Sequence, residues 1–89
     1  MITIWKYEFT PDNEVKLRIP RGYKILHVRS QHGGHITLWV KVDTNEPLVQ
    51  CTLYVYGTGH SIENSTYKQY AGTVLCPPFV WHVFFEQTF

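Results

Sequence analysis

The sequence predicts an all-β domain of about seven strands, built as a small antiparallel sandwich or a partly open barrel. Apolar residues recur at every second position along most of the chain, which is the spacing of strands with one buried face. Turn-forming residues separate these segments roughly every 8–12 residues, as they do in sandwiches and small barrels. Apolar residues nowhere keep helical spacing over a longer stretch. We therefore expect at most one short helical turn.

The alternation places the strands and the turns between them. The expected strands are residues 3–9, 15–19, 24–31, 35–43, 49–56, 67–75 and 80–86. His32-Gly33-Gly34 is a tight-turn sequence, which predicts that residues 24–31 and 35–43 form a hairpin. Gly72 interrupts the sixth strand and predicts a β-bulge. The one expected helical turn lies at residues 63–66.

The chain has 89 residues, enough for a single domain that spans residues 1–89. A chain of this size has a small core and is expected to be marginal as a monomer. Three Trp, six Tyr and five Phe make up 16% of the residues, more bulky apolar surface than such a core easily buries. The sequence therefore predicts a homo-oligomer, a dimer or larger, in which surplus rings meet a second body.

Charge and cysteine content limit the classes of partner. Eight basic and seven acidic residues give a net charge of +1, which argues against binding to duplex nucleic acid. A small anionic ligand stays possible because it needs only a few cations. The chain lacks a long apolar run, and Met1 leads directly into a strand, so we expect neither a membrane segment nor a leader peptide. The expected compartment is the cytoplasm, with Cys51 and Cys76 reduced.

Two strands combine an aliphatic face with an unusual second face. In residues 35–43 the second face carries Trp39 and Lys41, and in residues 49–56 it carries Tyr54 and Tyr56. We expect these faces to lie on one sheet surface, to which strand 24–31 adds His27 and Arg29. Rings mixed with cations suit a planar anionic ligand, or a protein partner. Packing of the rings against a second sheet is the third interpretation.

A glycine loop follows the fifth strand. Its glycines allow backbone N–H groups to converge on an anion, with hydroxyl and imidazole groups as further donors. A tight turn that only reverses the chain explains the same residues. The candidate ligand-binding residues are this loop together with nearby aromatic and basic side chains, namely Gly57, Thr58, Gly59, His60, Ser61, Tyr54, Tyr56, Arg29 and Trp81.

Catalytic and metal sites are not predicted. Asp12 and Asp43 both lie at turns, so a Ser–His–Asp arrangement has no support. The two cysteines lack the spacing of a zinc site, and no cofactor is expected. His27 and His82 both lie mid-strand and are candidates for acid–base chemistry, and a small phosphodiesterase would use His60 or His82.

The last strand is apolar on both faces, with His82 the only exception in residues 79–85. A strand of this kind is either central in a sandwich or an edge that pairs with another chain. The second interpretation favours a dimer.

Several motifs carry a family resemblance. They include Ile4-Trp5-Lys6-Tyr7, Tyr56-Gly57-Thr58-Gly59-His60-Ser61-Ile62 and Val80-Trp81-His82-Val83-Phe84. The chain resembles a family of small proteins from tailed bacteriophages and prophages whose domain has no known function. The resemblance covers nearly the whole chain. It implies a phage accessory protein in the host bacterial cytoplasm, and it implies no activity.

The resemblance leaves three hypotheses for function open. The first is an oligomeric sponge that sequesters a small anionic nucleotide-type immune signal without cleaving it. The second is a protein–protein inhibitor of a host defence complex, or a virion-associated interaction protein. The third is the His-dependent phosphodiesterase. The first two rest on analogy with the roles of small phage proteins.

Overall fold

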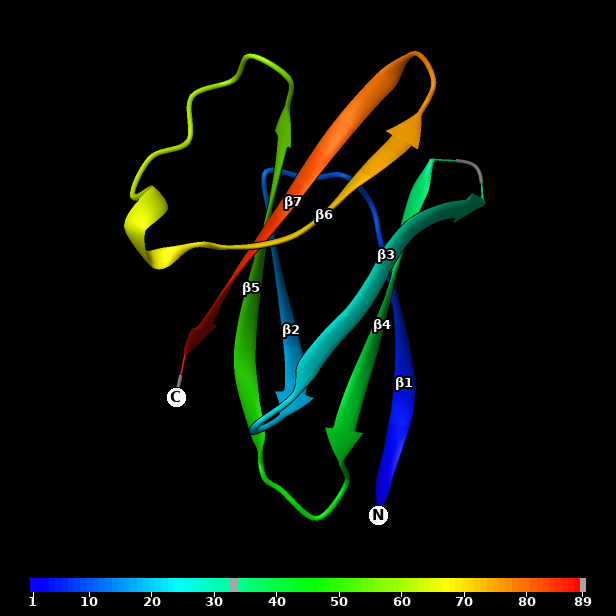
Figure 1. The fold of residues 1–89 in the computed structure, drawn as a ribbon, viewed down its shortest axis with the longest axis vertical. Coiled ribbons are helices and arrows are strands. Elements are labelled where there is room, and N and C mark those ends of the chain that lie inside the picture. Colours follow the sequence, from blue (N-terminus) through cyan, green and yellow to red (C-terminus); the bar gives the residue numbers. More distant parts are fainter. Residues whose placement is uncertain (33, 89) are drawn as a thin grey trace.

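The computed structural model describes residues 1–32 and 34–88, and it forms a two-layer antiparallel sandwich (Figure 1). One layer is a three-stranded sheet and the other a four-stranded sheet. The shortest dimension of 16 Å fits two stacked sheets. The predicted all-β class is therefore confirmed, as a sandwich and not as a barrel.

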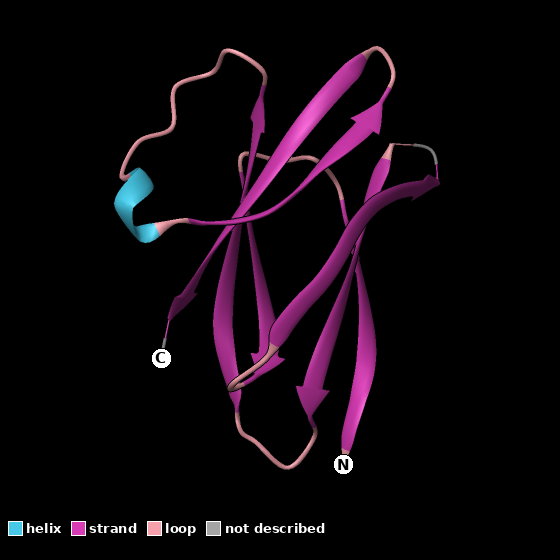
Figure 2. Cartoon of the chain, in the orientation of Figure 1, coloured by secondary structure: helices cyan, strands magenta, loops and turns pink. Residues whose placement is uncertain are grey.

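Within the described ranges the chain forms seven strands and one 3-10 turn. Their bounds are β1 Ile2–Phe9, β2 Glu14–Pro20, β3 Lys24–His32, β4 His35–Asp43, β5 Leu48–Gly57, η1 Ser65–Tyr67, β6 Gln69–Cys76 and β7 Phe79–Thr88. The short helical turn begins two residues later than expected (Figure 2). Asn64 starts it with a left-handed φ of 55°, a conformation that asparagine tolerates.

Sheet A has the strand order β1-β4-β3. Strands β3 and β4 pair in antiparallel fashion, which confirms the predicted hairpin. Gly33, at its turn, lies outside the described residues. Between β1 and β4 the register places Tyr7 opposite Leu38 and Phe9 opposite Ile36. These side chains face the core because residues opposite one another share a face of the sheet.

Sheet B has the strand order β2-β5-β7-β6. Strand β7 lies inside this sheet, with β5 on one side and β6 on the other. The apolar last strand is thus a central strand. The sequence favoured a dimer because this strand, as an edge, could pair with another chain. That reason does not apply to a central strand.

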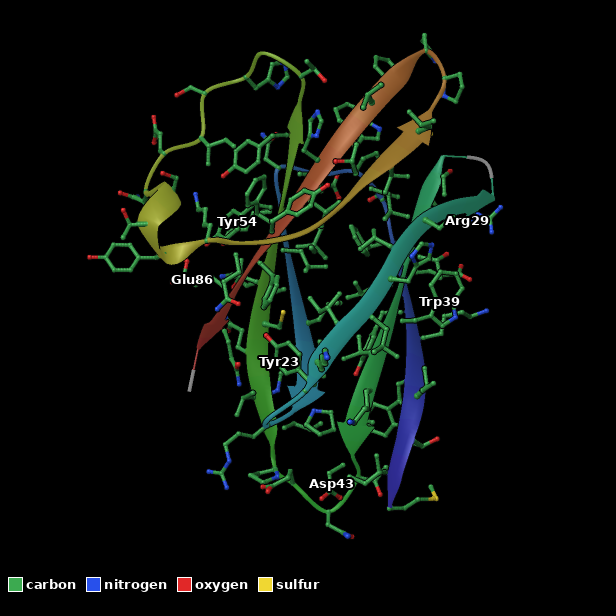
Figure 3. The ribbon with its side chains drawn as sticks, viewed as in Figure 1. Tyr23, Arg29, Trp39, Asp43, Tyr54 and Glu86 are labelled. Carbon is green, nitrogen blue, oxygen red and sulfur yellow. The ribbon has the colours of Figure 1, made fainter. Side chains whose placement is uncertain are left out.

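The expected aromatic and basic surface is confirmed for β3 with β4, where His27 lies opposite Trp39. Its extension to β5 is wrong, because β4 and β5 belong to different sheets. A short loop between Asp43 and Leu48 carries the chain from sheet A to sheet B. Trp39 therefore lies on the outer face of one sheet and Tyr54 on the outer face of the other (Figure 3). The period of two fixes which residues share a face of a strand, but it does not fix which strands pair.

The core lies between the sheets. Fully buried side chains from β4 meet those from β5, and they include Ile36, Leu38, Val40, Cys51 and Leu53. Tyr23 and Cys51 lie side by side in this core, and burial raises the pKa of both groups. Both cysteines are free thiols, of which Cys51 is buried and Cys76 is half-buried.

Strands β3 and β6 pack against each other at one side of the sandwich. The register of β6 on β7 shifts between Tyr70 and Gly72, which confirms the predicted bulge. A Cβ at Gly72 would lie 3.3 Å from the Cβ and Cγ2 atoms of Val28 on β3. Glycine at this position therefore lets the two sheets approach closely.

Candidate functional site

The surplus of aromatic residues stays at the surface. Among the aromatic side chains that the structure describes, only Phe9 and Tyr23 are buried. Tyr54 and Tyr56, which the sequence singled out, are half-buried. Many of the remaining rings gather on the outer face of sheet B, beneath the loop that joins β5 to β6.

A ring cluster forms where β5, β7 and β6 pair. The register places Phe84 between Tyr54 on β5 and Tyr70 on β6. The Phe84 ring meets the Tyr56 ring edge to face, at 5.9 Å between centroids and 73° between planes. It meets the Tyr70 ring at 5.5 Å and 62°. Such tilted contacts are the favoured geometry of aromatic pairs. We call Tyr54, Tyr56, Tyr70 and Phe84 the ring cluster.

Lys68 ties the end of the loop to this cluster. Its Nζ atom lies 4.2 Å from the centroid of the Tyr54 ring, within cation–π distance. The same atom donates hydrogen bonds to the hydroxyl of Tyr56 at 2.8 Å and to the carbonyl of Glu63 at 2.6 Å. The ammonium group therefore holds the loop against the sheet.

Glu86 completes the polar contacts of the cluster. Its Oε2 atom accepts a hydrogen bond from the Tyr54 hydroxyl at 3.1 Å (Figure 3). Burial, this hydrogen bond and the charges of Glu86 and Glu14 raise the pKa of Tyr54 from 10.0 to about 12. Tyr54 is thus a protonated donor at neutral pH.

His82 connects the loop to β6 through hydroxyl groups. Its Nε2 atom lies 2.8 Å from the Thr58 hydroxyl, and its Nδ1 atom lies 3.1 Å from the Thr73 hydroxyl. The Thr73 hydroxyl also hydrogen-bonds to Tyr70. A chain of hydrogen bonds therefore runs from the glycine loop across β7 to the ring cluster.

The glycine loop is a closed turn. The N–H of Gly57 donates to Nδ1 of His60 at 3.2 Å, and the N–H of His60 donates to the Gly57 carbonyl at 3.1 Å. A Cβ at Gly57 would lie 2.9 Å from Cε1 of His60, so the imidazole ring rests on this glycine. Gly59 has a φ of 89°, which favours glycine. Two of the N–H groups expected to converge on an anion are thus engaged within the loop.

A pocket of about 240 Å³ lies between this loop and the ring cluster. Its lining residues, which include no carboxylate, are Tyr56, Gly57, Thr58, Gly59, His60, Ile62, Tyr70, His82 and Phe84. We call it the loop pocket. An adjoining hollow of about 340 Å³ is lined by Glu14, Glu63 and Lys68 among others.

The structure brings most of the predicted site residues together. Tyr56 and the segment from Gly57 to His60 line the loop pocket, while Tyr54 and Ser61 line the adjoining hollow. Arg29 lies apart on β3 in the other sheet, in a groove beside Thr73 (Figure 3).

Trp81 also lies away from the loop pocket. Its ring stacks on Phe79 at 5.1 Å between centroids, and it lines a hollow near the turn between β6 and β7. Successive side chains of a strand point to opposite faces, so Trp81 points to the core side and His82 to the outer side.

Several residues of this region were not among the predicted binding residues, and they include Ile62, Lys68, Tyr70, His82 and Phe84. His82 and Phe84 alternate along one strand, so the sequence held a signal that they share a face. Lys68 carried no such signal, because its position depends on how the loop folds back.

Two observations concern catalytic and metal chemistry. Cys51 is buried, which raises the pKa of its thiol and disfavours the reactive thiolate. Across residues 1–32 and 34–88, the structure groups no three His, Cys, Asp or Glu side chains that could hold a metal ion. The same part of the chain contains no helix with the length and hydropathy to span a membrane.

Comparison with known proteins identifies the family. A domain of unknown function (DUF7352) matches residues 1–89. The chain belongs to the DUF7352 family. No curated protein matches the chain, and no solved structure does. The resemblance of nearly the whole chain to a family without known function is thus confirmed.

Proposed function

We propose that this chain is a non-catalytic binding protein that holds the planar part of a small nucleotide-type ligand in the loop pocket. The observation that carries the proposal is the ring cluster, which a hydrogen-bonded loop covers on the outer face of sheet B. A surface that only faces water needs neither the rings nor the loop contacts. Aromatic and polar groups that converge on a pocket are typical of ligand sites.

The lining of the loop pocket suits a nucleobase. Tyr70 and Phe84 offer rings for stacking against a planar ligand, and Thr58 and His60 offer hydrogen-bonding groups. The phosphate end is expected on the glycine-loop side, because carboxylates line the adjoining hollow instead.

The size of the pocket limits how much of a ligand it holds. Pockets for drug-sized ligands span roughly 300–1,000 Å³, and the loop pocket measures about 240 Å³. One base with part of its sugar fits this volume better than a whole dinucleotide. The remainder of a larger signal is expected to extend outside the pocket.

The contacts of His60 and His82 fit a protein that holds its ligand without cleaving it. Both ring nitrogens of His82 meet threonine hydroxyls, and Nδ1 of His60 accepts the Gly57 N–H. These contacts position the loop, and neither histidine has a carboxylate partner among them. A general base oriented for hydrolysis commonly has such a partner.

The proposed setting is that of an oligomeric phage accessory protein in the host bacterial cytoplasm. There it would sequester a nucleotide immune signal and blunt host defence. The motifs that resemble phage proteins support this setting, as does the surplus of rings at the surface.

A second candidate function, an interaction protein that inhibits a host defence complex or joins the virion, has its own supporting feature. Leu75 is 72% exposed and Phe79 is 54% exposed, on either side of the turn between β6 and β7. The neighbouring hollow of about 410 Å³ is lined by Pro11, Pro77 and Trp81 among others. Exposed apolar groups of this kind favour a protein partner at this end of the sandwich.

Calorimetric titration with AMP, cyclic di-GMP, cyclic di-AMP and cyclic ADP-ribose tests the ligand proposal. We expect one of these probes to bind, and Tyr70→Ala to weaken its binding at least tenfold because a stacking ring is lost. Tyr67→Ala is the matched control, since Tyr67 is an exposed tyrosine that does not line the loop pocket. Equal losses in the two variants, or no binding by any probe, would contradict the proposal.

Mass spectrometry of the bound probe separates binding from hydrolysis. After long incubation, heating should release the probe intact. A cleaved product that disappears in His82→Ala would establish the phosphodiesterase instead.

A further inference from the structure

The free edges of the two sheets differ in how well they are protected. Strands β3 and β6 pack against each other, and each has a shift of register that marks a bulge. Strand β2 carries the exposed charges of Glu14, Lys16 and Arg18 and ends at Pro20. Bulges, charges and proline all hinder pairing with another strand.

Strand β1 lacks most of these protections. It pairs with β4 through all eight of its residues without a shift of register, and it contains neither glycine nor proline. Among the described residues, nothing pairs with its other edge. Ile2 is 63% exposed, Ile4 is 58% exposed and Trp5 is 36% exposed. A long, regular and partly apolar edge of this kind is a template for another strand.

The backbone of β1 shows which residues offer hydrogen bonds at this edge. The Met1 carbonyl accepts a hydrogen bond from the Thr44 N–H at 2.9 Å. Given the register with β4, odd-numbered residues of β1 turn their N–H and C=O groups toward β4. The even-numbered residues turn theirs to the free edge, and these are Ile2, Ile4, Lys6 and Glu8.

We propose that β1 pairs antiparallel with β1 of a second copy of the chain, about a two-fold axis at Trp5. Sheet A of each copy then joins into one continuous sheet. In this register Ile2 lies opposite Glu8 of the second copy, and Ile4 lies opposite Lys6. In this antiparallel register each of the four edge-facing residues lies opposite an edge-facing residue of the second copy, so all of them form hydrogen-bonded pairs within β1.

The side chains support a second copy as the occupant. At the axis Trp5 meets the same residue of the second copy, and aromatic pairs across strands are favourable. The aliphatic stem of Lys6 covers Ile4. Lys6 also keeps the ion pair with its own Glu8, at 3.6 Å, so no charge loses its partner.

This proposal rests on the homo-oligomer of the proposed function and assigns β1 as the surface through which two copies pair. Strand β1 lies at one side of the sandwich and the loop after β5 at the other (Figure 1). The loop pocket therefore stays open to a ligand in the dimer. The tests below use no ligand, and we expect Tyr70→Ala to leave the dimer intact. A wild-type dimer that binds none of the nucleotide probes would count against the pocket alone.

Charge at position 4 tests the proposed pairing. Ile4→Lys places a lysine opposite Lys6 of the second copy and should raise the dimer dissociation constant about tenfold or more. Ile4→Glu removes the same apolar side chain but faces Lys6 with an opposite charge, so it should remain a dimer. Tyr67→Lys, at an exposed tyrosine away from β1, is the control for added charge. Sedimentation velocity measures all four proteins.

A wild-type chain that is monomeric up to millimolar concentration would overturn the proposal. So would equal dissociation constants for Ile4→Lys and Ile4→Glu.

Disulfide formation tests the position of the axis. Residues at a non-hydrogen-bonded antiparallel pair are close enough for a disulfide. In a Cys76→Ser background, Trp5→Cys should therefore cross-link two chains under mild oxidation. Thr3→Cys should not, because Thr3 lies opposite Tyr7 of the second copy. A dimer that cross-links through Thr3→Cys and not through Trp5→Cys would contradict this register.

Discussion

Single residues on the outer face of sheet B are held by contacts that differ in kind. Lys68 is fixed by a ring face and two oxygen acceptors, and His82 by two hydroxyls. Tyr54 donates to a carboxylate. Because each side chain has partners on a neighbouring element, the loop pocket is largely formed before any ligand arrives.

The raised pKa of Tyr54 gives a prediction about alkaline stability. The unfolded chain loses this phenol proton near 10.0 and the folded chain at about 12. Between these pH values the unfolded state binds fewer protons, so this group lowers the free energy of unfolding as pH rises. Absorbance titration of tyrosinate should show a phenol that ionises at about 12 and that Tyr54→Phe removes, apart from Tyr7 and Tyr23, whose pKa values burial also raises.

Glu86→Gln checks the cause of that shift. Removing the carboxylate charge should move the Tyr54 ionisation toward 10.0 while a hydrogen-bond acceptor remains. An unchanged ionisation in Glu86→Gln would mean that burial and the remaining neighbours, Glu14 among them, set the pKa of Tyr54 without the Glu86 charge.

Gly57 gives a second prediction at this scale. In Gly57→Ala the new Cβ would displace the His60 ring, and the hydrogen bond from the residue 57 N–H would be lost. We expect a loss of about 1 kcal/mol in unfolding free energy, measured by urea denaturation. In a His60→Ala background the same change should cost much less, because the ring it meets is gone. An equal cost in both backgrounds would contradict this account of Gly57.

The sequence predicts part of the site at the residue scale. The glycines mark the loop, but the reason for glycine at position 57 is a ring three residues later, which only the folded loop reveals. The contacts of the Lys68 ammonium also appear only in the folded chain, because the two tyrosine rings near it belong to β5, well before Lys68 in the sequence.

At the scale of elements, alternation predicts strands and faces well and pairing poorly. The strand segments and the two faces of each follow from the period of two. Strands β4 and β5 are neighbours in the chain but not in a sheet, because the Thr44–Pro47 loop turns the corner between layers. The ring cluster depends on the register of β5, β7 and β6, which no local pattern encodes.

The contact between β3 and β6 is testable at this scale. Gly72→Ala would press a methyl group against Val28 at 3.3 Å, and we expect a loss of about 1–3 kcal/mol from overpacking. Val28→Ala removes the opposing branched side chain. The double variant should therefore lose less unfolding free energy than the two single variants lose together. Chemical denaturation measures all three losses. Additive losses would show that the strands do not meet at these residues.

At the scale of the whole molecule, one thin core carries the stability of a small chain. Leu38 is fully buried between the sheets, and Leu48 is 47% exposed at the start of β5. Leu38→Ala should lower the free energy of unfolding by about 2–5 kcal/mol, a large part of the usual stability of a domain. Leu48→Ala is the matched control and should cost far less. Similar urea midpoints for the two variants would contradict the assigned core.

Composition predicts that rings remain outside this core, and it does not predict where they gather. Trp39, Tyr54, Tyr56 and Trp81 are all half-buried, so none is sealed inside. They belong to two sheets and to both faces of one of them. The expected site containing Arg29 and Trp81 therefore divides into separate surfaces, and the loop pocket keeps the glycine loop and the tyrosines.

The most direct measurement is mass spectrometry of small molecules released by heat from the chain after its expression in bacteria challenged with phage. The proposed function predicts one intact nucleotide-type compound bound to the wild-type chain and to Tyr67→Ala, and absent from Tyr70→Ala. A wild-type chain that carries no small molecule, or that releases only cleaved product, would contradict it.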